Sequence, residues 1–291
     1  MSNQARHTPR QSAGAKRRRK KQSWKGAFWL LIAAVVLIIG VDFLMARNRS
    51  SHSHGMRPDY DSNLTAVRTN PAMDEEMVEY TAMTVSFNAD YHVPNWVAYE
   101  LTADEARGEE PRYNKFQQDR RVKGCATPAD YRNTGFDRGH MAPAADMKWD
   151  SVAMRESFMM TNIVPQIHSI NSGAWSKLED KCRSHAIADS AVYIVSGPVL
   201  TDPIDFRIGA TGVAVPRRFF KVILSPYADP PQAIGFIVPN EDFRGGIQAC
   251  AVSVDSVEAL TGHDFFSALP DDIEEQLEST PNFHKWSRIN R

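Results

Sequence analysis

The sequence predicts an α+β fold, and three observations support this class. Several runs rich in β-branched and aromatic residues are bounded by Gly or Pro, as strands are. Other segments carry apolar residues at helical spacing. The helices do not alternate regularly with the strands, which argues against a doubly wound parallel sheet. With no internal repeat, one domain from about residue 75 to 269 is the simplest division of the chain.

The first half of this domain contains two predicted strands and two predicted helices. Tyr80–Phe87 and Trp96–Leu101 are β-branched and aromatic with a turn between them, and both predict strands. Ser151–Met160 has helical character. A second helix follows from an apolar stripe at i, i+3 and i+7, formed by Trp175, Leu178 and Cys182. We expect Trp175 in the core and the nearby His185 on the helix surface.

The second half contains three more predicted strands, one helix and a tail. The strands are Ala191–Ser196, Phe219–Leu224 and Ala233–Val238. Asp255 and Glu258 have the spacing of a capping box, and Gly262 is suited to end the helix that they begin. Residues 270–291 form an acidic tail with few core-forming residues, which predicts a peripheral helix or a segment without fixed structure.

The first 46 residues have a different composition from the domain. No acidic residue precedes Asp42, and nine basic residues stand within 1–26. Residues 27–46 are apolar apart from Asp42, and 20 residues suffice for a membrane-spanning helix. The basic leader predicts a cytoplasmic N-terminus, a single-pass anchor and a catalytic part outside the cytoplasm, periplasmic or extracellular. A cleaved signal peptide is the alternative, although its apolar core would be shorter, about 7–15 residues.

A polar linker is predicted at 47–74, because this stretch is rich in small and polar residues and has no apolar periodicity. Beyond it, disulfides could form in an extracytoplasmic compartment. Cys125, Cys182 and Cys250 allow one bridge and one leftover thiol, and their spacing does not decide which pair. Without a C-x-x-C motif, a cysteine zinc site is not expected.

The charge of the domain restricts how it could bind a polyanion. From residue 71 onward there are 21 Lys and Arg against 32 Asp and Glu, a net charge of −11. Domains that bind nucleic acid across a broad surface are more often basic. A nucleic-acid site here must therefore be a local basic cleft.

The motif with the most chemical content lies at residues 137–140, Asp-Arg-Gly-His. His140 has an ordinary pKa of about 6.5, which suits a general base. Arg138 stands two positions earlier, so on a strand both side chains would share a face and could reach one phosphate. Further on, Asn171 offers a neutral oxygen, and Mg²⁺ prefers oxygen ligands and keeps several waters. This combination favours metal-assisted cleavage of a phosphodiester.

The run 137–144, Asp-Arg-Gly-His-Met-Ala-Pro-Ala, is accompanied downstream by further runs, among them Thr161-Asn162-Ile163, Pro165-Gln166, Asn171, Trp175, Leu178-Glu179, Val195–Pro198 and Val213–Pro216. Together they resemble the DNA/RNA non-specific endonucleases, the ββα-metal (His-Me finger) group, over about residues 80–268. The resemblance implies a ββα-metal finger domain with a central, mostly antiparallel sheet flanked by helices, here preceded by one transmembrane helix.

The same resemblance implies roles for particular residues. His140 would activate the attacking water, and Asn171 would be the one direct protein ligand of Mg²⁺, with Mn²⁺ left open as a substitute. Arg138 would stabilise the phosphate. Asn162 would orient the site, and Glu179 would hold water molecules around the metal.

An upstream arginine of the family matches Arg112 less closely, since Lys115 competes for that place. The resemblance also implies cleavage of DNA and RNA alike through their backbone phosphates, leaving 5′-phosphate ends, and leaves a homodimer open. Two alternatives stay open: a catalytically silent nucleic-acid-binding module of the same fold, and a phosphodiesterase for small nucleotides.

Overall fold

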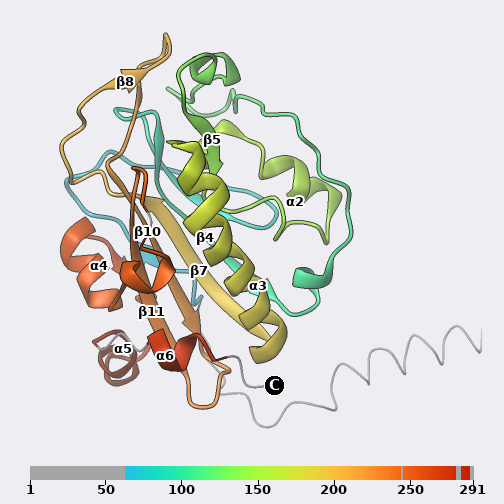
Figure 1. Ribbon diagram of the computed structural model, residues 1–291, viewed down its shortest axis with the longest axis vertical. Helices are drawn as coiled ribbons and strands as arrows, with labels where there is room; N and C mark the ends of the chain where they lie inside the picture. The colour runs from blue at the N-terminus through green and yellow to red at the C-terminus, as the bar shows by residue number, and fades with distance from the viewer. Residues whose placement is uncertain (1–62, 244, 280–282, 289–291) are drawn as a thin grey trace, which may run out of the picture. The chain divides into compact units, whose positions relative to one another are not determined.

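The computed structural model describes residues 63–291 apart from 244, 280–282 and 289–291 (Figure 1). The predicted basic N-terminus, the membrane span at 27–46 and most of the linker lie outside the described residues. Within the described part of the chain, no helix has the length and apolar character needed to cross a membrane.

A seven-stranded antiparallel sheet forms the centre of the fold, which confirms the α+β class (Figure 1). Its spatial order is β12-β11-β10-β7-β4-β3-β2. The strands are β2 (Glu76–Glu79), β3 (Thr84–Asn88), β4 (Val93–Thr102), β7 (Ala191–Pro198), β10 (Arg218–Ser225), β11 (Gln232–Pro239) and β12 (Ala251–Val252). The four predicted strands from Trp96 onward all fall within this sheet.

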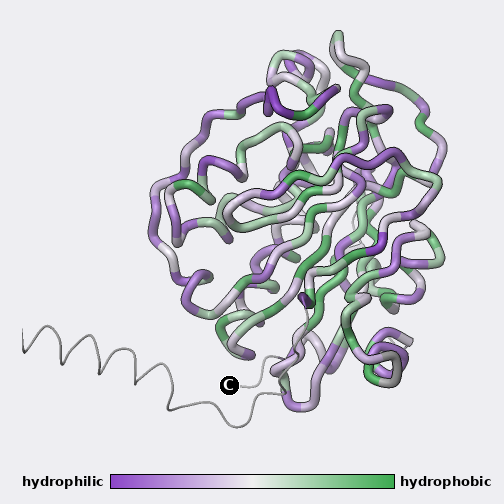
Figure 2. The backbone as a smooth tube through the Cα atoms, turned by 180° about the vertical axis from the view of Figure 1, so that it is seen from behind, coloured by the Kyte–Doolittle hydropathy of each residue, from purple (hydrophilic) through white to green (hydrophobic). Residues whose placement is uncertain are grey.

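Helices cover both faces of the sheet. Neighbouring residues of a strand point to opposite faces, so apolar neighbours in one strand pack against helices on both sides. Phe219 of β10 packs in one apolar cluster with α3 (Ser176–Asp189). The adjacent Phe220 packs in the other cluster with α4 (Val254–Thr261). Seen from behind, the strands carry most of the apolar sequence and the outer loops are polar (Figure 2). The sheet is therefore buried on both sides and forms a rigid base for the loops at its edge.

A separate hairpin carries the Asp-Arg-Gly-His motif. β5 (Asp137–His140) pairs antiparallel with β6 (Ile163–Gln166), and α2 (Ser151–Glu156) lies between them in sequence. After β6 the chain enters a π-helical turn, Ile170–Trp175, which is kinked at Gly173 (φ −112°, ψ −105°) and leads into α3. The chain order is β5, α2, β6 and α3, so the paired strands β5 and β6 are followed by α3, which is the ββα arrangement that the resemblance implies.

The folded part reaches upstream of residue 75, into the stretch predicted as linker. Leu64 is buried, and β1 (Val67–Arg68) pairs with β13 (Asp264–Phe265). A further small ribbon, β8 (Arg207–Ile208) with β9 (Val213–Ala214), stands apart from the main sheet. The sequence does not predict β1, because a two-residue strand in a polar stretch is too short to show any periodicity.

Two predicted elements are shorter than expected. The run Tyr80–Phe87 is not one strand, because a turn closed by the bond from Tyr80 N to Met83 O (2.9 Å) separates β2 from β3. The helix predicted over Ser151–Met160 ends at Glu156, and its first turn is capped by Asp150, whose carboxylate accepts from two backbone amides. The apolar pattern therefore predicts both elements but not where each begins and ends.

The start of α4 also differs from the prediction. Ser253 is the capping residue, and its hydroxyl accepts from Ser256 N, whereas Asp255 lies inside the first turn. Glu258 instead accepts from Phe265 N at 2.7 Å. The predicted end is confirmed, because Gly262 adopts a left-handed conformation with φ of 72°.

The C-terminal tail contributes to the core. α5 (Asp271–Glu278) is followed by α6 (Phe283–Trp286), and Trp286 is only 1% exposed. Its indole stacks on His185 with ring centroids 4.7 Å apart. The expectation of a surface His185 is therefore wrong, because α6 covers that face of α3. The three cysteines, Cys125, Cys182 and Cys250, are all buried and free, so no bridge forms.

Candidate active site

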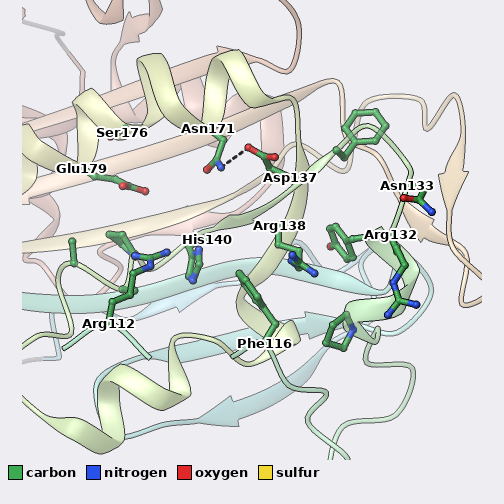
Figure 3. A pocket seen from close by; sticks show the side chains of 16 residues that line it. Arg112, Phe116, Arg132, Asn133, Asp137, Arg138, His140, Asn171, Ser176 and Glu179 are labelled. Carbon is green, nitrogen blue, oxygen red and sulfur yellow. Dashed lines mark hydrogen bonds between the residues drawn. The ribbon is translucent and has the colours of Figure 1, made fainter. Parts of the chain in front are cut away.

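An open pocket of about 710 Å³ lies beside the β5–β6 hairpin (Figure 3). Of the six predicted site residues, the structure brings five together in its lining: Arg112, Arg138, His140, Asn171 and Glu179. They come from a loop, a strand, a π-helical turn and a helix that are separated by up to 67 residues of sequence, from 112 to 179. Asn162 is the exception and does not line the pocket.

The strand β5 orients two of these side chains. Arg138 and His140 both face the pocket, as the alternation of a strand requires for positions i and i+2. Gly139 between them points the other way, where a Cβ atom would collide with the side chain of Gln166 on β6. A glycine at this position therefore lets the two strands pack closely and keeps the motif in register.

His140 is buried and held by aromatic rings. Its exposed fraction is 7%, and its ring meets Phe158 edge-on at 5.0 Å and Phe116 at 5.4 Å between centroids. Its Nε2 atom has no hydrogen-bond partner among the described residues. Trp175 Nε1 donates to the His140 carbonyl oxygen at 3.1 Å, which anchors the end of the strand. The imidazole is thus fixed in position while one ring nitrogen is left available.

Burial and charge both keep this imidazole neutral. Burial, followed by the positive charges of Arg112 and Arg138, lowers the pKa of His140 to about 3. A protonated imidazole here would lose hydration and face two guanidinium groups. At neutral pH the ring is therefore unprotonated and able to accept a proton.

Asn171 is oriented by a carboxylate. Its Nδ2 donates to Asp137 Oδ2 at 2.9 Å, as the dashed line in Figure 3 shows. A carboxylate only accepts hydrogen bonds, so the amide nitrogen must face Asp137 and the amide oxygen must face away from it. The exposed His168 also contacts this carboxylate oxygen, with its Nδ1 at 2.8 Å. The side-chain oxygen of Asn171 is thereby directed into the pocket on the side of Glu179 (Figure 3).

Glu179, on the first turn of α3, supplies a carboxylate on the same side. Burial, opposed by the positive charge of Lys221, raises the pKa of Glu179 to about 7. Its charge is therefore incompletely balanced by the protein. A neutral amide oxygen beside a poorly neutralised carboxylate suits a hard cation such as Mg²⁺ that keeps most of its waters. The residues present thus fit the metal that the sequence predicts.

Asn162 uses all of its amide atoms to hold the backbone that follows His140. Its Oδ1 accepts from Ala142 N at 2.9 Å, and its Nδ2 donates to Ala142 O and Ser157 O at 2.8 Å each. It is fully buried. The side chain fastens the segment after β5 to the start of β6 and touches the pocket only through that segment.

The structure also identifies pocket residues that sequence reasoning missed. Arg132 lines the pocket, so three arginines stand against the two carboxylates of Asp137 and Glu179. Their arrangement gives the acidic domain the local basic cleft that its composition required. Arg132 lies in an irregular loop without periodicity. Only its closeness in sequence to Arg138 could have indicated that Arg132 lies in the pocket.

The ring of Phe116 contacts both His140 and Arg138. Its ring packs on His140, and the guanidinium of Arg138 lies over the ring at 4.6 Å from its centre. Arg112 lies similarly over Phe158 at 5.1 Å. Aromatic faces attract guanidinium groups, so the rings that bury the histidine also position two cations around it.

The family described as DNA/RNA non-specific endonuclease matches residues 61–272, which is most of the chain. The chain belongs to the DNA/RNA non-specific endonuclease family. The match includes the hairpin, the π-helical turn and α3, and therefore every residue assigned to the pocket.

Several curated relatives of this endonuclease family are similar over much of the chain. Mitochondrial nuclease EXOG of Mus musculus is 34% identical over 244 residues, 73% of this chain and 66% of the relative. EXOG of Danio rerio is 38% identical over 68% of this chain and 63% of its own length. The chain thus spans slightly less than two thirds of these two relatives. Nuclease C1 of Cunninghamella echinulata is 34% identical, with 68% of this chain and 86% of that protein covered.

A solved structure shares the endonuclease fold. The crystal structure of an EndoG/EndoGI complex matches with a TM-score of 0.65 and 29% identity, covering 71% of this chain and 90% of that one.

Proposed function

We propose that this chain is a metal-dependent endonuclease that hydrolyses phosphodiester bonds of DNA and RNA without sequence preference. The observation that carries the proposal is the neutral, unpartnered Nε2 of His140, which stands in a pocket beside Arg138 and Asn171. A base, a cation for phosphate and a metal-ligating oxygen are what hydrolysis of a phosphodiester needs.

In this mechanism His140 Nε2 accepts the proton of the water that attacks phosphorus. Arg138 and Arg112 lie on either side of the histidine (Figure 3), where their charges would stabilise the negative charge that develops on the phosphate. The rings of Phe116 and Phe158 exclude bulk water from the imidazole and hold its orientation. Departure of the 3′ oxygen would leave 5′-phosphate ends.

Asn171 would hold the metal directly and Glu179 would hold water molecules around it, with Mg²⁺ as the first candidate and Mn²⁺ as a substitute. When bound, the ion supplies positive charge to the scissile phosphate and to the departing oxygen. Asp137 would contribute indirectly, because it keeps the Asn171 oxygen directed into the pocket.

The spread of cations favours a polymer over a dinucleotide. Arg112, Arg138 and Arg132 follow one another along the pocket (Figure 3), and all three side chains are exposed. A substrate with one phosphodiester could occupy the arginine pair nearest His140, whereas a nucleic acid strand offers successive phosphates to all three. The alternative of a small-nucleotide phosphodiesterase leaves Arg132 without a role.

Digestion of plasmid and of RNA with Mg²⁺, with EDTA and with His140→Ala tests the proposal. We expect EDTA to abolish cleavage and the variant to lose about 10³-fold in rate, since general base catalysis contributes about 10²–10⁴-fold. His284→Ala, an exposed histidine in α6, is the matched control and should keep full activity. Cleavage that persists in EDTA, or in a folded His140→Ala protein, would contradict the assignment. Nucleic-acid binding by the wild type without any cleavage would instead indicate a silent binding module.

We further propose that residues 27–46 anchor the protein in the cell membrane as a single pass, with residues 1–26 in the cytoplasm and the nuclease domain outside it. The support is the apolar run and the basic leader of the sequence. Membrane fractionation of tagged full-length protein, followed by protease treatment of intact cells, tests it. Release of the protein by carbonate washing would argue against an anchor.

A homodimer also stays a proposal. Light scattering on the purified domain distinguishes a mass near that of one chain from twice that mass.

A further inference from the structure

Three carboxylates meet between α4 and α5, away from the nuclease pocket. Asp255 and Glu258 lie on α4 and Glu278 lies on α5, and one carboxylate oxygen of each is within 4.8 Å of the others. None of the three lines the pocket that contains His140. Figure 1 shows the two helices near each other at the left, below β5.

Glu278 is the residue that makes this cluster unusual. It is only 3% exposed, and its Oε1 is buried without a hydrogen-bond partner among the residues that the structure describes. Leaving a buried carboxylate oxygen unsatisfied costs free energy, so such atoms normally have a partner. The oxygen belongs to the carboxylate that faces Asp255 and Glu258.

The surroundings of Glu278 are acidic. Burial and the charge of Glu258 are the main causes that raise the pKa of Glu278 to about 9, and Glu274, Asp255 and Asp264 act in the same direction. The guanidinium of Arg68 is paired with Asp264 at 2.8 Å. No ion pair found within the described residues neutralises Asp255, Glu258 or Glu278.

We propose that Asp255, Glu258 and Glu278 bind a Ca²⁺ ion that links α4 to α5. Ca²⁺ takes oxygen ligands at about 2.3–2.6 Å, so opposite ligands stand about 4.6–5.2 Å apart. Opposite ligands of Mg²⁺ stand only about 4.0–4.2 Å apart and need near-ideal octahedral geometry. The three oxygens lie within 4.8 Å of one another, which leaves room for Ca²⁺, whose coordination geometry is flexible, whereas Mg²⁺ demands near-ideal octahedral geometry.

The three carboxylates differ in their exposure to solvent, and this order suits a bound ion. Glu278 is buried, Glu258 is half-buried with one oxygen bound to Phe265 N, and Asp255 is exposed. The ion would enter from the Asp255 side and complete its shell there with water. Glu278 would gain the partner that its buried oxygen lacks, and α5 would be held to the body of the domain.

Thermal unfolding of the full chain tests the proposal in an Asn171→Ala background, which removes the proposed nuclease metal ligand. Adding 10 mM Ca²⁺, an amount on the order of ten times the ~1 mM affinity of weak extracellular sites, should raise Tm by about 3 °C. Isothermal titration should give one Ca²⁺ per chain. The same concentration of Mg²⁺ should give a clearly smaller shift.

Glu278→Gln should abolish the Ca²⁺-dependent rise, and Asp255→Asn should weaken Ca²⁺ affinity about tenfold. Asp255→Asn changes an exposed side chain, so it tests Ca²⁺ binding even where Glu278→Gln fails to fold. Glu275→Gln, an exposed carboxylate of the same helix outside the cluster, is the matched control and should keep the full rise. No rise in the Asn171→Ala parent, an equal rise in Glu278→Gln and Glu275→Gln, or an equal rise with Mg²⁺ would overturn the proposal. None of these outcomes depends on nuclease activity.

Discussion

His140 is available as a base because of what surrounds it rather than because of a partner that activates it. The aromatic rings of Phe116 and Phe158 remove water, and two arginines oppose its protonation. In the described structure no carboxylate accepts a hydrogen bond from its Nε2. In the proposed mechanism, the availability of this base therefore depends on the free-energy cost of protonating the buried ring.

This cost predicts how stability depends on pH. The folded pKa of His140 lies near 3 and the unfolded value near 6.5, so the unfolded chain binds the extra proton between these values. Stability from the buried neutral ring is complete above pH 6.5 and is lost as pH falls toward 3. Between pH 6.5 and 5 we expect a loss of about 2 kcal/mol from this residue.

Urea unfolding at pH 7 and pH 5 measures the effect. His140→Asn should show a smaller loss than the wild type over that interval. His263, whose pKa burial lowers to about 4, contributes equally to both proteins and cancels in the comparison. An unchanged pH dependence in the variant would mean that the ring titrates near its ordinary value.

The bond between Asp137 and Asn171 predicts a change in metal affinity. In Asp137→Ala the Asn171 amide can rotate, so its oxygen no longer faces the pocket in every molecule. Residues that orient a ligand typically change metal affinity by about 10–100-fold when mutated. We expect the half-saturating Mg²⁺ concentration to rise in that range while activity at saturating Mg²⁺ falls less.

The control for this prediction is His168→Ala. It removes the other contact of the same carboxylate oxygen and leaves the bond to Asn171 in place. Equal Mg²⁺ requirements in both variants would show that Asp137 does not act through Asn171.

At the scale of elements, the β5–β6 hairpin depends on a residue that never enters the pocket. The Oδ1 of Asn162 accepts a hydrogen bond from Ala142 N. Its Nδ2 donates to Ala142 O and to Ser157 O. The sequence motif placed Asn162 in the site, and only the structure shows that all of its polar atoms are engaged by backbone.

Asn162→Ala should therefore lower stability as well as activity. It leaves buried backbone groups of Ala142 and Ser157 without partners, which predicts a loss of about 2–4 kcal/mol in the free energy of unfolding. Activity should fall because the segment after His140 shifts. Full stability with lost activity, measured by urea unfolding and plasmid cleavage, would instead show a direct contact with substrate.

The element boundaries illustrate what local pattern can predict. The strands with alternating or fully buried apolar runs, such as Phe219–Leu224, appear in the structure because a central strand buries both faces. His185 was misassigned because its partner Trp286 lies a hundred residues later, on a helix predicted to be peripheral. A pattern read over 18 residues carries no information about a contact at that distance.

At the scale of the whole molecule, an acidic domain presents a basic cleft. The net charge of −11 from residue 71 onward repels a polyanion at long range, while Arg112, Arg132 and Arg138 attract it locally. Binding should therefore be modest and sensitive to salt, with log K falling about 2–3 units per tenfold rise in salt for three phosphate contacts.

Arg132→Ala should reduce that slope by about one, because one phosphate contact is lost. Fluorescence anisotropy with a His140→Ala protein and labelled duplex in EDTA at several salt concentrations measures it without cleavage. Arg155→Ala changes an exposed arginine of α2 outside the pocket and should leave the slope unchanged. Equal slopes for the two variants would place Arg132 outside the substrate path.

The sequence by itself determined the α+β class, the family and five of the residues that meet in the pocket, because these follow from short motifs and from the spacing of apolar residues. The tertiary structure decided which way each side chain faces. Asp137 orients Asn171 across 34 residues, and Asn162 turns out to hold backbone. The acidic tail supplies Trp286 to the core and Glu278 to a second carboxylate cluster. Such contacts join residues far apart in the chain, and only the folded backbone brings them together.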